Sequence, residues 1–195
     1  MLMNNTYREK LLNAILFFVV NVKKPSKLKI FKLLYFLDFR HYKETGRSVT
    51  NLTYYALEKG PVPLDLYSQV ADNNVPVDFE KALAILPFES EFTGKKGGIF
   101  KAKRKVDLSV FSPRETRILA ELAEIFREID AKMISDISHF KKHPWDRTFT
   151  EKGPNAKIDY ALALDPESEV SLEDAATLMQ DRQEMLTAFP LKETI

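Results

Sequence analysis

Residues 27–63 read KLKIFKLLYFLDFRHYKETGRSVTNLTYYALEKGPVP. Between Ile30 and Phe39 every residue is apolar or aromatic except Lys32 and Asp38. A helix that is apolar on nearly every side is covered by its neighbours rather than laid on a surface. Each large side chain buried in this way contributes about 1.5–3 kcal/mol to stability. The stretch therefore predicts a buried central helix around which a single domain is built.

Both ends of this helix carry recognisable signals. Ser26 is a suitable N-cap and Gly46 a suitable left-handed stop, so the helix is expected over 27–45. Further on, Gly60–Pro63 fixes φ at two prolines and keeps the residue before each proline out of the α region. We predict an ordered loop over 47–62 that ends in a stiff corner. Such a corner favours shape recognition over chemistry.

This part of the chain resembles the Panacea domain, also called the SocA-like domain. The resemblance extends from Tyr7 to Leu164. At Asn51 members of that family more often carry glycine, and asparagine also tolerates the left-handed conformation. The motifs that carry the resemblance are KLLYFLDFRHYKETGRSVT, YYALEKGPVP, FSPRE at 111–115, ISDISH at 134–139 and PW at 144–145.

The resemblance implies a function as well as a fold. Proteins of this family are typically antitoxins that neutralise a co-encoded toxin by binding it, and at least one acts as a proteolytic adaptor. The expected partners are thus a cognate protein toxin and an ATP-dependent protease, with no membrane, no cofactor, no metal and no catalytic residue. The partner-binding residues implied by the family motifs are Tyr35, Asp38, His41, Tyr54, Gly60, Pro61, Val62, Pro63, His139 and Trp145.

Composition agrees with one globular domain in a reducing compartment. The chain has 195 residues, 45% of them apolar and 29% charged, and it contains no cysteine. Disulfides, thiolate catalysis and cysteine-ligated zinc are therefore excluded. The apolar run from Leu11 to Val20 is too short for the roughly 20 residues that span a bilayer. It predicts a packed amphipathic helix over 5–22 in a cytoplasmic protein.

The remaining elements are read from turn and capping signals. Ser112 to Glu115 form a capping box with proline at the first helical position, so a helix starts there. Its apolar stripe is expected to comprise Ile118, Leu122, Ile125, Phe126 and Ile129. The other expected elements are a short helix opening near Pro63, one between Pro76 and Leu83, a β-hairpin with strands 83–88 and 98–104, a helix over 131–142 that stops before Pro144, a short helix within 157–164 and a last helix over 172–187 capped by Ser171.

Charge divides the chain into two parts. Residues 165–195 hold eight acidic and two basic side chains, a net charge of −6. Because the whole chain carries +1, residues 1–164 carry +7. The sequence thus predicts a mainly α fold with a small β-hairpin, one domain over 1–164 and an acidic helical extension over 165–195. This extension docks on its own domain or contacts a partner.

A basic hairpin supports an alternative function. Six cations between residues 95 and 105 lie beside two aromatic residues, a combination that suits a phosphate backbone. In that reading the chain is a DNA-binding autoregulator; in the plainer one, lysines protect an edge strand from aggregation. The cations are Lys95, Lys96, Lys101, Lys103, Arg104 and Lys105.

Two further groups of side chains raise the question of chemistry. Asp136, His139 and His143 would share one face of a continuous helix, as ligands of a metal-dependent hydrolase do. His139 is more simply a polar neighbour of the Trp145 indole, whose N–H needs an acceptor when buried.

The second group is Asp38 and His41, three residues apart, which could form an oriented general base. The plainer interpretation is that a buried Asp38 must be satisfied. Arg40, Arg47 or a backbone N–H could do so.

Overall fold

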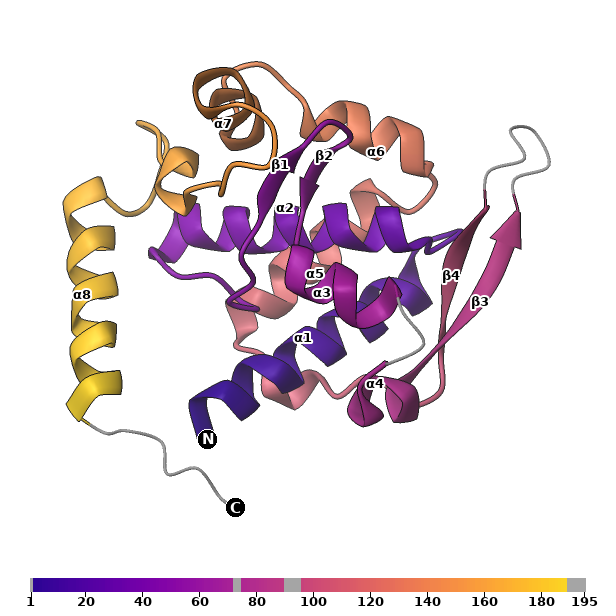
Figure 1. Cartoon of the computed structure of the whole chain (residues 1–195). Coiled ribbons are helices and arrows are strands. Elements are labelled where there is room, and N and C mark those ends of the chain that lie inside the picture. Colours follow the sequence, from indigo (N-terminus) through magenta and orange to yellow (C-terminus); the bar gives the residue numbers. More distant parts are fainter. Residues whose placement is uncertain (1, 72–74, 90–95, 189–195) are drawn as a thin grey trace.

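The helix α2 (Lys27–Thr45) crosses the middle of the computed structural model, and the other elements pack around it (Figure 1). The structure describes residues 2–71, 75–89 and 96–188. The fold of these residues is mainly helical with a small β component, as the sequence predicts, and this component consists of two antiparallel strand pairs. The further elements are α1 (Leu2–Asn21), β1 (Tyr55–Leu57), β2 (Gly60–Val62), α3 (Leu64–Ala71), α4 (Val77–Ala82), β3 (Leu83–Glu89), β4 (Lys96–Ala102), η1 (Leu108–Val110), α5 (Pro113–Ile125), α6 (Ala131–Ser138), α7 (Pro144–Lys152), η2 (Tyr160–Ala163) and α8 (Leu172–Ala188).

The predicted bounds of α2 are confirmed, together with both caps. The Ser26 hydroxyl accepts a hydrogen bond from the Lys29 N–H at 3.3 Å. Gly46 adopts a φ of 68° and donates its N–H to the Tyr42 carbonyl at 2.8 Å. Asn51 is also left-handed, with a φ of 58°, as its tolerance of that conformation allows.

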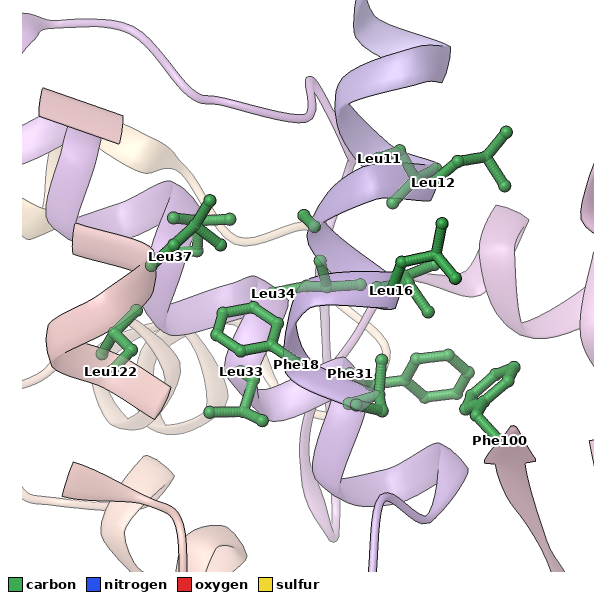
Figure 2. Packing of buried hydrophobic residues seen from close by; sticks show 14 of the residues in the cluster. Leu11, Leu12, Leu16, Phe18, Phe31, Leu33, Leu34, Leu37, Phe100 and Leu122 are labelled. Atoms are coloured by element: carbon green, nitrogen blue, oxygen red, sulfur yellow. The ribbon is translucent and has the colours of Figure 1, made fainter. Parts of the chain in front are cut away.

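The core forms where α2 meets α1 and α5 (Figure 2). Leucines of α2 face Phe18 of α1 and Leu122 of α5, and Phe31 lies toward Phe100 of β4. The run from Leu11 to Val20 is therefore a packed helix, as expected, although Val20 itself is exposed. The labelled core residues are Leu11, Leu12, Leu16, Phe18, Phe31, Leu33, Leu34, Leu37, Phe100 and Leu122.

The predicted hairpin is present as β3 and β4, which pair from Leu83 with Ala102 to Glu89 with Lys96. The strand β4 is tied to the domain by the Phe100 N–H, which donates to the Pro25 carbonyl at 3.0 Å. Within the loop expected over 47–62, residues 55–62 form a second hairpin, β1 with β2, whereas 47–54 have no helix or strand, as predicted. Strands of three residues carry too short an alternating pattern to be read from sequence.

The region after residue 113 differs from prediction in two places. The capping box on Ser112 and Glu115 is confirmed, with both of its hydrogen bonds formed. In the predicted stripe Ile118, Leu122 and Phe126 are buried, but Ile125 is exposed to solvent. The helix expected over 131–142 ends at Ser138, and Pro144 starts a new helix, α7, instead of only ending one. Proline fits the first helical turn because N–H groups at that position have no acceptor within the helix, so the lack of an N–H costs nothing there.

The last helix, α8, stands beside the domain at the left of Figure 1. Ser171 caps it by accepting from the Asp174 N–H at 3.0 Å, as the sequence predicts. The short helix expected within 157–164 is the 3₁₀ turn η2. Within the described ranges, no helix has both the length and the apolar character that crossing a bilayer requires.

Candidate partner-binding site

The hairpin of β1 and β2 is held from beneath by two side chains from distant parts of the chain. The Lys32 Nζ, on α2, donates to the Pro61 carbonyl at 2.7 Å. The Trp145 Nε1, on α7, donates to the Leu57 carbonyl at 3.0 Å. Because each strand has its own donor, the hairpin is fixed relative to the helices that surround it. Burial lowers the pKa of Lys32 to about 7.

Gly60 lets the hairpin approach these helices closely. Its φ is 96°, and a Cβ at this position would lie 2.7 Å from each of three polar atoms: Lys32 Nζ, His139 Nε2 and Ser138 Oγ. Only glycine fits such a place without displacing its neighbours. The family motif around Gly60 is therefore explained by crowding as well as by backbone conformation.

His139 and Trp145 form the floor under the turn. Their rings stack with centroids 4.0 Å apart and an interplanar angle of 21°. The predicted packing of His139 against the indole is confirmed, but the acceptor for the indole N–H is the Leu57 carbonyl rather than His139. Burial lowers the pKa of His139, and the nearby Lys32 adds to that effect.

Asp38 organises the loop that leads into the hairpin. Its carboxylate accepts hydrogen bonds from the Val49 N–H, the Thr50 N–H and the Tyr54 hydroxyl, each at 2.8 Å, and from the Thr50 hydroxyl. Backbone N–H groups are thus among the hydrogen-bond donors to the buried Asp38 carboxylate, which was one of the three expected alternatives. Burial raises the pKa of Asp38, and these hydrogen bonds act against the rise.

The two arginines considered for Asp38 are not its hydrogen-bond partners. Arg40 instead pairs with Glu44 and Glu121. His41 contacts the Arg47 carbonyl through Nδ1 at 2.6 Å. Among the described residues no hydrogen bond joins His41 to Asp38, so the arrangement of an oriented general base is not formed.

The ten residues that the family motifs single out lie mostly below the surface. Nine of them are buried, and His139 is half-buried. Tyr35 packs its ring against those of Phe39 and Tyr54, with centroids 4.3 and 5.5 Å away. Most of the set therefore supports the hairpin from within, which sequence alone could not distinguish from surface contact.

An apolar groove opens on the outer side of this hairpin. Its volume is about 530 Å³, and Val62 is the one residue of the expected set that lines it. Tyr67 of α3 is half-exposed beside it and packs against Phe31. We call this the hairpin groove; it is lined by Leu28, Leu57, Glu58, Lys59, Val62, Leu64, Tyr67, Pro154 and Asn155. Sequence reasoning missed Leu28, Leu64, Tyr67 and Pro154, because nothing in their spacing relates them to the hairpin.

Two of the six cations in the basic hairpin are already engaged within the domain. Lys103 donates to the Glu80 carbonyl at 2.8 Å, and Arg104 pairs with Glu9 at 3.3 Å. Lys101 and Lys105 are exposed. The placement of Lys95 and of the side chain of Lys96 lies outside the described part of the structure.

The metal site considered for Asp136, His139 and His143 is not formed, because the helix breaks between α6 and α7. Asp136 belongs to α6, His139 follows its end, and His143 is the N-cap of α7, so the three do not share one helix face. Across the described ranges, no group of three histidine, cysteine or acidic side chains is placed to hold a metal ion.

Comparison with known families identifies one match for this chain. The family model described as antitoxin SocA-like, Panacea domain, matches residues 30–146. The chain therefore belongs to the SocA-like antitoxin family. The matched range includes α2 from Ile30 onward, both hairpins and the floor formed by His139 and Trp145, but not α8. Comparisons with curated proteins and with solved structures found no match.

Proposed function

We propose that this chain is the antitoxin of a toxin–antitoxin pair and neutralises its toxin by binding it in the hairpin groove. One observation carries the proposal: the family motif GPVP forms a wall of the groove through Val62, while Lys32 and Trp145 hold the same hairpin from below. The toxin would be masked stoichiometrically, without a chemical step, in the cytoplasm. The chain would also present the toxin to an ATP-dependent protease, and the lifetime of the toxin in cells with and without this chain tests that step.

The rigidity of the groove suits this role. A surface that is already in its bound shape loses little freedom on association, so more of the contact energy remains as affinity. The ten motif residues then have two roles: Val62 touches the toxin, and the others position the hairpin. The groove volume lies within the roughly 300–1,000 Å³ of sites that enclose a ligand group.

Tyr67→Asp tests the groove at a side chain that is half-exposed. Tyr67 is 50% exposed, so the variant is expected to fold, whereas Val62→Asp and Trp145→Ala place the change at buried positions. Co-expression with the toxin gene should restore growth for the wild type and fail for Tyr67→Asp. Val77→Asp is the matched control, because Val77 is 64% exposed on α4, outside the groove.

The outcomes separate binding from folding. Loss of protection by Tyr67→Asp at an unchanged melting temperature supports the groove, provided that Val77→Asp still protects. Full protection by a stable Tyr67→Asp variant would remove the groove as the toxin site.

A further inference from the structure

The helix α8 rests on the domain through a narrow contact. Among the α8 side chains that the structure describes, Ala175 is the buried one, and it lies against the glycine that ends α2. A Cβ on Gly46 would be 3.4 Å from Ala175 Cβ and 3.1 Å from Leu178 Cδ1. Leu172 and Met179, by contrast, are more than 60% exposed. The described side chains of α8 thus include a packed alanine and two large apolar groups that face solvent.

The segment that leads into α8 is fastened more firmly. Lys43 pairs with Asp165 at 2.7 Å, and Arg114 pairs with Glu169 at 2.6 Å. The Glu169 N–H also donates to the Lys43 carbonyl at 3.2 Å. These contacts fix where the helix begins, so α8 forms a wall at a defined position beside the domain.

Between α8 and the domain lies a cleft of about 470 Å³. We call it the α8 cleft. Leu178 and Met179 form its α8 side, and Leu52 and Ile158 contribute apolar surface from the domain. Tyr42 and Tyr160 add aromatic rings to the lining. The cleft therefore offers apolar surface on both sides.

Its charge is strongly one-sided. Arg47, Lys152 and Lys157 line the cleft and are exposed. Among the described residues none of the three forms a salt bridge. The lining carboxylate is Asp159, and its Oδ1 accepts from the Ala161 N–H at 2.9 Å as the cap of η2. Three cations thus face the cleft without a carboxylate to pair them.

We propose that the α8 cleft binds an acidic segment of the toxin that also inserts an apolar side chain. This inference rests on the proposed function and adds a second contact to it. The cations would meet carboxylates on the toxin, and Leu52, Ile158, Leu178 and Met179 would enclose its apolar side chain. Complementary charges of this kind mainly speed association and exclude wrong partners.

The lining favours a polypeptide over a nucleic acid. A nucleic acid carries a negative charge at every nucleotide, so part of its backbone would have to lie along the α8 side, where the lining residues are the apolar Leu178 and Met179 and residues 165–195 carry a net charge of −6. A short acidic segment can place its carboxylates on Arg47, Lys152 and Lys157 and direct apolar atoms toward α8. Half of the residues that line the cleft, among them Lys152, Lys157 and the two α8 residues, lie outside the range that the family model matches, so the cleft can distinguish this chain's toxin from those of its relatives.

The test uses the full chain and the toxin encoded beside it, recognised as a small gene product that is lethal alone. Binding is measured by calorimetry at low and high salt for the wild type and for the triple variant Arg47→Glu, Lys152→Glu and Lys157→Glu. We expect the triple variant to bind at least tenfold more weakly at low salt and to lose most of the salt dependence. The matched control reverses three exposed cations elsewhere, Lys81, Lys101 and Lys105.

Each outcome has a separate meaning. Toxin binding by the wild type with an unchanged affinity of the triple variant would overturn the inference and leave the proposed function standing. No binding by the wild type would remove the proposed function itself. Tight binding of duplex DNA that the triple variant loses would also overturn the inference. Recovery of affinity on reversing an acidic toxin residue to lysine would establish the pairing.

Discussion

Lys32 and Pro61 are joined by a hydrogen bond of 2.7 Å from the lysine Nζ to the proline carbonyl, deep between α2 and β2. Lys32 is fully buried, and the described residues bring no carboxylate to its amine. Burial therefore lowers its pKa from the usual 10.5 to about 7. A lysine in the centre of an apolar helix is thus used as an uncharged or weakly charged donor that holds the family's proline-rich hairpin.

The first prediction concerns stability against pH. Above pH 7 the unfolded chain keeps the proton on Lys32 and the folded chain releases it, so the free energy of unfolding should rise with pH. The slope is about half-maximal at pH 7, approaches about 1.4 kcal/mol per pH unit by pH 8 to 9 and vanishes about one unit below pH 7. Urea unfolding at several pH values measures it. Lys32→Met should lose this slope and Lys101→Met should keep it; equal slopes in both variants would contradict the account.

The second prediction uses three glycines as an internal series. Gly60 combines a positive φ with crowding, Gly153 has a φ of 84° in open space, and Gly97 has neither constraint. Alanine at Gly97 should change stability by less than about 0.5 kcal/mol, and at Gly153 lower it by about 1–3 kcal/mol. Gly60→Ala should be the most destabilising in thermal unfolding. A Gly60→Ala variant no worse than Gly153→Ala would show that crowding by Lys32 and His139 is unimportant.

The third prediction separates charge from hydrogen bonding at Asp38. In Asp38→Asn the amide oxygen can still accept from the two backbone N–H groups, and the Thr50 and Tyr54 hydroxyls can turn to accept from its NH₂. Asp38→Leu leaves both N–H groups buried without an acceptor. We expect the leucine variant to be about 2 kcal/mol or more less stable than the asparagine variant. Equal unfolding free energies would refute this role.

Much of the fold follows from local sequence signals. The bounds of α2, the caps at Ser26 and Gly46, and the start of α5 were predictable because each depends on a few neighbouring residues. The β1–β2 hairpin was not predictable, because its strands are short and its carbonyls are held by Lys32 and Trp145 from far along the chain. The start of α7 at Pro144 was missed because proline can both end one helix and begin the next.

The sequence predicted which segment forms the candidate site, but not which residues line its exposed surface. The family motifs lead to the β1–β2 hairpin, yet most of the residues they name are buried beneath it. Which side of a strand faces solvent depends on the elements packed on the other side. Tyr67 and Pro154 join the hairpin groove only because α3 and the segment after α7 fold onto the same hairpin. The spacing of these residues along the sequence gives no sign that they meet in the fold.

The fourth prediction tests how α8 is attached. Ala175 is 1% exposed and its neighbour Ala176 is exposed, so Ala175→Glu should detach the helix while Ala176→Glu should not. Limited proteolysis should then cut after residue 165 at least fivefold faster in the first variant. The melting temperature of the domain should change little, because only a small apolar area is lost. Equal cleavage rates in the two variants would show that α8 does not depend on this contact.

The most direct test of the central claim is a titration of toxin activity with the purified chain. Neutralisation by binding predicts that activity falls linearly and reaches zero at a fixed molar ratio, that this ratio is independent of incubation time, and that toxin released from the complex is chemically intact and active. Inactivation by substoichiometric amounts that grows with time, or a toxin recovered in covalently altered form, would contradict the account.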